Sequence, residues 1–139
     1  MESYILCIKS GNPWNKGYVH TASKLHSIGS TLCQYNCFDH GLRAYKEALE
    51  VRRLTLEGDN LDIASTLQGI ADVYERKGKL EDALKYYAEA FSIMHTQLGP
   101  ENALVVHVSY RIGVIKSYLK SGSSRKIFKE IQRKRTNRT

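Results

Sequence analysis

The stretch LQGIADVYERKGKLEDALKYYAEA, residues 67–90, decides the fold of this chain. Its apolar residues recur at helical spacing in two runs, first at Leu67, Ile70, Ala71 and Tyr74 and then at Ala83, Tyr87 and Ala90. Residues spaced by three and four share one face of a helix, so each run predicts a helix that buries one stripe. Between the runs, two basic residues precede Gly78, a sequence typical of a helix C-terminus. The stretch therefore predicts two packed helices joined by a tight turn.

This helix pair is one copy of an internal repeat with a period of 42 residues. The apolar residues of the preceding copy, Leu25, Ile28, Tyr45, Ala48, Leu56 and Ile63, coincide with Leu67, Ile70, Tyr87, Ala90, Leu98 and Val105. Small residues coincide as well, Gly29 with Ala71 and Gly41 with Ala83. Small side chains at matching positions let paired helices approach closely, while the larger ones fill the space beside them.

The repeat predicts an all-helical chain. The predicted helices cover residues 21–35, 39–57, 61–77, 80–98, 104–121 and 125–135, and Asp59 and Asn60 offer an N-cap to the third. The one strand-like run, residues 4–8, has no partner strand. Residues 1–19 are therefore predicted to form an irregular or weakly helical leader.

The pattern of residues 67–90 resembles a tetratricopeptide repeat, in which aromatic and small residues occupy these positions. The 42-residue period, with its links at 57–64 and 97–102, is similar to the kinesin light chain subtype. The resemblance covers about residues 21–122 and implies an all-α fold of antiparallel helix pairs stacked as a short solenoid. It implies a leader at 1–19, a repeat domain at 20–122 and a basic capping helix and tail at 123–139. The repeat units are about 22–63, 64–105 and a degenerate 106–135.

Two units depart from the family pattern. The first has Leu32 where tyrosine is usual and Asn36 where the glycine between helices is usual. The third needs a two-residue insertion to align, and its second helix has Ile127, Ile131 and Lys134 instead of small and aromatic residues. The third unit is therefore either a degenerate end cap or part of a longer array. We expect marginal stability, relieved by self-association through an exposed end face or by further natural sequence.

Composition is that of an ordinary soluble domain, with 139 residues, 42% of them hydrophobic and 25% charged. No apolar run approaches the ~20 residues that a membrane-spanning helix needs. The first residues lack the basic start and long apolar centre of a secretory signal. We therefore expect a soluble cytoplasmic protein. Cys7, Cys33 and Cys37 are predicted to be buried reduced thiols, because their number and spacing suit neither disulfides nor zinc.

The sequence shows no arrangement of residues that is typical of a catalytic site. The five histidines are scattered, and the carboxylates between residues 62 and 82 suit solvated helix surfaces and first turns. The chain has no phosphate-binding glycine loop and no dinucleotide fingerprint. The sequence therefore predicts no enzyme activity, no cofactor and no metal site.

Binding residues follow from the family resemblance. In tetratricopeptide proteins the first helix of each pair lines a concave face, which implies a peptide-binding row in each unit. The rows are Ser23, His26, Ser30 and Gln34 in the first unit and Gln68, Asp72, Glu75 and Arg76 in the second. Gln68 replaces an asparagine frequent in the kinesin light chain subtype, whose carboxamide can bond a peptide backbone. Some family members clamp a terminal carboxylate with lysine, arginine and asparagine, and these are replaced here.

We therefore expect the partner to be a protein segment of mixed chemistry that touches both rows, which gives the chain a scaffold or adaptor role. The alternative interpretation of each row is a set of ordinary exposed polar residues on helices.

A second candidate element is the basic tail. Residues 125–139 contain seven basic residues against Glu130 alone, a local charge of +6 in a chain of net charge +7. The tail could bind nucleic acid or act as a nuclear import signal centred on residues 133–135. It could also dock on a membrane surface, or form an amphipathic capping helix with Ile127, Phe128 and Ile131 on one side. Mixed charge in the predicted rows favours a protein partner over nucleic acid, and capping is the favoured role of the tail.

Overall fold

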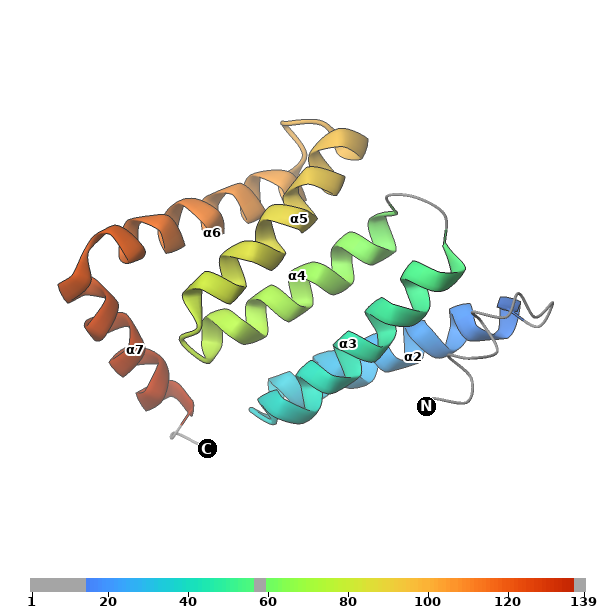
Figure 1. Ribbon diagram of the computed structural model, residues 1–139, viewed down its shortest axis with the longest axis horizontal. Helices are drawn as coiled ribbons and strands as arrows, with labels where there is room; N and C mark the ends of the chain where they lie inside the picture. The colour runs from blue at the N-terminus through green and yellow to red at the C-terminus, as the bar shows by residue number, and fades with distance from the viewer. Residues whose placement is uncertain (1–14, 57–59, 137–139) are drawn as a thin grey trace. The chain divides into compact units, whose positions relative to one another are not determined.

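The computed structural model describes residues 15–56 and 60–136, and this part of the chain contains helices and no strand (Figure 1). The helices are α2 (Asn15–Gln34), α3 (Phe38–Thr55), α4 (Leu61–Arg76), α5 (Leu80–Leu98), α6 (Ala103–Lys120) and α7 (Gly122–Thr136). The all-α prediction is confirmed. None of these helices combines the length and apolar content needed to cross a membrane.

The helix bounds agree with the predicted ranges to within one residue for α4, α5 and α6. The N-terminal helix is longer than predicted, because α2 begins at Asn15, inside the stretch predicted to be an irregular leader. No proline interrupts the chain after Pro13 in this region, so helical hydrogen bonding can extend toward the N-terminus. The rest of that leader lies outside the described residues. The last helix also begins earlier than predicted, at Gly122.

The chain divides between Thr66 and Leu67 into two compact units. Unit 1 contains α2, α3 and the first part of α4. Unit 2 contains the remainder of α4 with α5, α6 and α7.

In unit 1, α2 and α3 lie close together at two glycines. A Cβ atom at Gly41 would lie 2.5 Å from Cys33 Sγ and 3.0 Å from the carbonyl oxygen of Gly29. A Cβ atom at Gly29 would lie 3.1 Å from the ring of Tyr45. Both helix backbones therefore need the absence of a side chain at this crossing, which explains why the repeat has small residues at these positions.

The turns between helices form where local sequence predicts them. Asn36 and Gly78, one period apart, have left-handed φ values of 62° and 77°. Lys79 N donates to the carbonyl of Tyr74 at 2.9 Å, which closes the end of α4 in the Schellman manner. Asparagine tolerates this conformation better than most residues, so Asn36 can replace the glycine of the pattern. Asn60 caps α4 as predicted, with its side-chain oxygen 2.7 Å from the Asp62 amide nitrogen.

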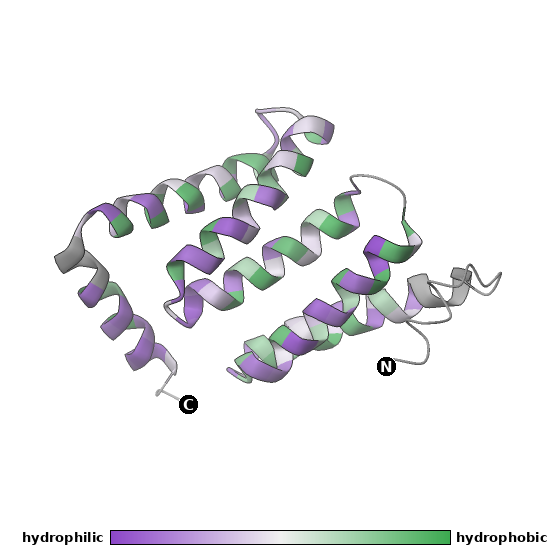
Figure 2. Cartoon of the chain, viewed as in Figure 1, coloured by the Kyte–Doolittle hydropathy of each residue, from purple (hydrophilic) through white to green (hydrophobic). Residues whose placement is uncertain are grey.

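In unit 2, the repeat positions form the core. Leu67, Ile70, Ala71 and Ala90 are completely buried, and Tyr87 is 1% exposed. α5 runs back along α4, and α6 runs back along α5 (Figure 1). α7 departs from the end of α6 at a steep angle instead of returning along it (Figure 1). It is also mainly hydrophilic, as Figure 2 shows.

Leucine at Ala71 or Ala90 should overpack the core of unit 2. Because neither alanine has any exposed surface, the added atoms must displace neighbours, which costs roughly 1–3 kcal/mol of unfolding free energy. Denaturant titration followed by circular dichroism measures the loss. Ala88→Leu, on the exposed side of α5, is the matched control. Equal stability of the two core variants and this control would contradict the core placement.

The two described cysteines differ in environment. Cys33 on α2 is buried and Cys37 is exposed, and neither forms a disulfide within the described part of the chain. The prediction of burial is therefore wrong for Cys37. The chain turns after Gln34, so Cys37 lies outside α2 as the residue that precedes α3. Cys7 lies outside the described residues.

Candidate functional site

Three of the four residues predicted on α4 line one pocket in unit 2. Asp72, Glu75 and Arg76 lie in the last two turns of α4, and the pocket has a volume of about 540 Å³. Gln68, one turn earlier, is half-buried and does not line this pocket. The other lining residues come from α6 and α7: His107, Tyr110, Arg111, Val114, Tyr118, Phe128, Ile131, Gln132 and Arg135.

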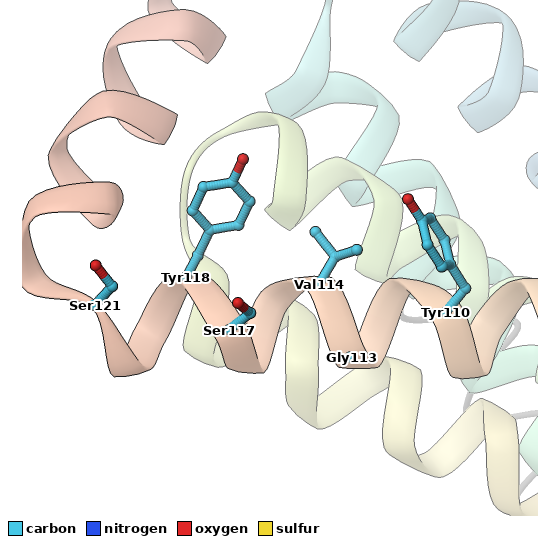
Figure 3. A pocket seen from close by; sticks show the side chains of 6 residues that line it. All are labelled: Tyr110, Gly113, Val114, Ser117, Tyr118 and Ser121. Atoms are coloured by element: carbon cyan, nitrogen blue, oxygen red, sulfur yellow. The ribbon is translucent and has the colours of Figure 1, made fainter.

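Part of the α6 wall obeys the 42-residue period. Shifting Gln68, Asp72 and Arg76 by one period gives Tyr110, Val114 and Tyr118, all of which line the pocket. They project from the same side of α6 (Figure 3) and border a second hollow of about 580 Å³ on that helix. The repeat could therefore have identified these residues, but the poor match of the third unit to the pattern made the correspondence between α4 and α6 positions hard to see. Gln132 and Arg135 of α7 carry no such signal.

A bidentate ion pair joins α4 to α6 at the pocket wall. Arg111 Nε donates to Glu75 Oε1 at 3.0 Å, and Arg111 Nη2 donates to Glu75 Oε2. The hydrogen bonds from Arg111 hold a buried carboxylate, and they raise the pKa of the Arg111 guanidinium. Paired bonds of this kind fix the relative orientation of the two groups. Glu75 therefore positions α6 as well as lining the pocket.

Asp72 is a partly desolvated carboxyl group. Burial raises its pKa, and the neighbouring Glu75 adds to this, whereas a hydrogen bond donated by the Tyr87 hydroxyl opposes the shift. The same burial and the nearby Asp72 raise the pKa of Tyr87, so Tyr87 stays protonated and acts as the donor. Asp72 thus faces the pocket and is anchored from the core side.

In unit 1, the row predicted on α2 is partly engaged in an arginine network. Arg52 is buried, and its Nη1 donates to the Thr66 hydroxyl at 2.5 Å and to His26 Nδ1 at 3.3 Å. Arg52 Nη2 also lies 3.5 Å from the Ser23 hydroxyl. Ser30 is half-buried and Gln34 is exposed near the end of α2. His26 and Ser23 therefore have a structural role in unit 1.

Comparison with known protein families accounts for the paired helices. The family model described as Tetratricopeptide repeat matches residues 20–96, more than half of the chain. The chain belongs to the tetratricopeptide repeat family. A search of curated proteins found no match to this chain. The matched range contains most of α2, all of α3 and α4, and most of α5, so two tetratricopeptide pairs lie inside it and α6 and α7 lie beyond.

Tetratricopeptide repeats generally mediate protein–protein interactions and serve as scaffolds, and the family is typically non-enzymatic. Within the matched range, the first helices of the two tetratricopeptide pairs are α2 and α4. The unit 2 pocket is lined from α4 and from α6 and α7, which lie beyond that range. Within the described side chains, no group of three or more His, Cys, Asp or Glu residues is arranged to hold a metal ion.

The basic C-terminal region is not uniform around α7. Arg135 lines the unit 2 pocket together with Arg76, whereas its neighbour Lys134 does not line it, and Lys134 Nζ lies 3.7 Å from Glu130 Oε1. From the sequence, the tail and the binding row are predicted to be separate elements. In the structure, one face of α7 belongs to the pocket that the tetratricopeptide row lines.

Proposed function

We propose that this chain is a protein-interaction module that binds a segment of a partner protein at the pocket of unit 2. Its role is that of a scaffold or adaptor, and it binds without catalysing a reaction. The 42-residue period further supports the kinesin light chain subtype, and the cytoplasm is the proposed compartment, with nuclear entry through the basic tail as the alternative. The row on α2 is proposed as a separate contact surface of unit 1.

One observation carries the proposal: residues that the repeat selects, Asp72, Glu75 and Arg76, meet aromatic and cationic residues of α6 and α7 around one pocket. A volume of about 540 Å³ lies within the range of roughly 300–1,000 Å³ found for ligand pockets. Tyrosine and arginine are, together with tryptophan, enriched among the residues that contribute most to protein binding. Tyr110 is 64% exposed, so its side chain is accessible to a partner.

The partner segment should combine polar and apolar groups. The pocket holds two carboxylates, Asp72 and Glu75, against three guanidinium groups, one of which is paired with Glu75. Asp72 would repel a strongly acidic segment, and Arg76 and Arg135 would repel a strongly basic one. Backbone and mixed side-chain contacts fit this distribution better than a single charge.

A photo-crosslinking amino acid at position 110 tests the proposal in cells that express the full chain. The probe at Tyr110 should give a discrete covalent adduct with a partner protein, because this side chain is exposed at the pocket. The control is the same probe at Leu104, which is 50% exposed in unit 2 but does not line the pocket. Equal adduct yields at both positions, or none at Tyr110, would contradict the proposal.

Alanine at Arg76 should reduce the adduct yield at least about fivefold, as expected for loss of a binding contact worth about 1 kcal/mol. Lys134→Ala removes the same charge from an exposed position of α7 that does not line the pocket, and it should leave the yield unchanged. A larger effect of Lys134→Ala than of Arg76→Ala would mean that net charge of the tail, and not the pocket, governs binding.

A further inference from the structure

α7 lies against the same surface that the proposed function uses. Phe128 and Gln132, one helical turn apart, are each only 7% exposed and line the pocket beside residues of α4 and α6. The ring of Phe128 packs on that of Tyr118, with centroids 4.7 Å apart. A Cβ atom at Gly78 would lie 3.4 Å from Lys129 Cγ, so the stem of Lys129 rests near the turn after α4. α7 is therefore seated by one face of its helix.

This seat differs from that of the second helix in the regular pair. α5 packs through Ala83, Tyr87 and Ala90, all buried. α7 leaves α6 at a steep angle (Figure 1), and Ile127 and Ile131 remain exposed apolar residues. A helix that completed the third pair would bury such residues. α7 instead packs beside the C-terminal ends of α4 and α6, with which it lines the pocket.

Gln132 is poorly satisfied in this seat. Its carboxamide offers two donors and an acceptor, yet it forms no hydrogen bond with any residue that the structure describes. Buried amide groups are normally hydrogen-bonded, because burial removes their bonds to water. Because burial of this carboxamide is not offset by a hydrogen bond to a described residue, α7 is held less tightly than its apolar contacts alone would hold it.

We infer that α7 is an intramolecular occupant of the unit 2 binding surface, and that partner segments bind by taking its place. The partner is then an amphipathic helix that presents an aromatic residue, a carboxamide four residues later and a guanidinium three residues after that, the spacing of Phe128, Gln132 and Arg135. This inference rests on the proposed function, since it describes the partner and the control of the same surface. Displacement of α7 is the step that opens the surface.

A labelled peptide tests the inference with the full chain. The probe is a fluorescein-labelled peptide with the sequence of residues 121–139, and its binding is followed by fluorescence polarisation. In the wild-type chain the tethered α7 competes at an effective concentration on the order of millimolar. Two single variants should release α7: Phe128→Ala removes the aromatic contact, and Gln132→Lys adds a buried cation. Each should lower the apparent Kd of the peptide at least tenfold.

Two controls make the result specific. The Lys134→Ala chain should bind the peptide as the wild-type chain does, because this residue is exposed. A peptide carrying Phe128→Ala should lose binding to the released chains. Equal Kd values for the wild-type and both released chains, or no binding to the released chains, would overturn the inference.

Hydrogen exchange on the wild-type chain gives a second measurement that needs no substitution. Excess unlabelled peptide should speed amide exchange in α7 at least tenfold and leave α5 unchanged. Unchanged exchange in α7 at saturating peptide would also overturn the inference.

If the probe at Tyr110 captures a partner equally well in the wild-type and Phe128→Ala chains, self-occupancy fails and the proposed function stands. If the peptide binds as expected but Tyr110 captures no partner, self-occupancy stands and the proposed function fails.

Discussion

Replacing Tyr87 by alanine is expected to lower the free energy of unfolding of unit 2 by about 3–5 kcal/mol. Tyr87 is the largest of the completely buried side chains, at 1% exposure, and it occupies the aromatic position of the repeat. Removing its ring leaves a cavity that the surrounding helices cannot close fully. The loss is measured as a shift in the denaturant midpoint, followed by circular dichroism. Tyr86→Ala, on the neighbouring and less buried residue, is the matched control and should cost less.

Tyr87→Phe separates the ring from its hydroxyl. The ring still fills the core, but Asp72 loses its buried donor, so we expect a smaller cost of about 1–3 kcal/mol. The matching change Asp72→Asn keeps an acceptor for Tyr87 and removes a charge that burial disfavours. A cost for Tyr87→Phe as large as for Tyr87→Ala would mean that the hydrogen bond, and not ring packing, dominates at this site.

The raised pKa of Asp72 sets the sign of the pH effect. Because its pKa is higher in the folded protein than in the unfolded chain, stability from this group is complete below the unfolded value and is lost as pH rises through the folded value. Asp72→Asn should therefore abolish this loss and be at least as stable as the wild type at pH 7. A strongly destabilised Asp72→Asn chain would contradict the assignment.

Arg52→Ala is expected to be the most damaging change in unit 1, at about 3 kcal/mol, because hydrogen bonds to a charged group contribute about 1.5–3 kcal/mol each. Arg52 is 7% exposed and donates to the Asp62 carbonyl at 3.0 Å and to the Thr66 hydroxyl at 2.5 Å. The bonds join α3 to the first turns of α4. Arg53→Ala, the exposed neighbour, is the matched control. Similar melting of the two variants would show that the network contributes little.

His26 makes the stability of unit 1 depend on pH. Burial lowers its pKa, the nearby Arg52 cation lowers it further, and Asp62 opposes the shift. The unfolded chain, with a histidine pKa of about 6.5, then binds more protons than the folded protein. Stability from this group is complete above about pH 6.5 and falls as pH drops toward the folded value. His26→Gln should flatten this slope in denaturation between pH 5 and 8, and an equal effect of His40→Gln would contradict the assignment.

Much of the fold follows from local sequence. Helix ends at Asn36 and Gly78 depend on which residues tolerate a left-handed backbone, and the Asn60 cap depends on a side chain two residues from its donor. These interactions span a few residues, so one copy of the pattern predicts the next. A spacing of four residues places Asp72 and Arg76 on one helix face, and the 42-residue period relates them to Val114 and Tyr118, which also line the pocket.

Tertiary structure decided what those residues meet. Glu75 pairs with Arg111, 36 residues away, and Asp72 accepts a hydrogen bond from Tyr87, 15 residues away. The repeat implies neither pairing. The seat of α7 is the clearest case. Its sequence predicts a helix with one apolar side and a basic side, but an amphipathic helix packs on any surface that buries its stripe. Which surface it covers depends on the shapes that α4 and α6 present together, and these exist only after the chain has folded.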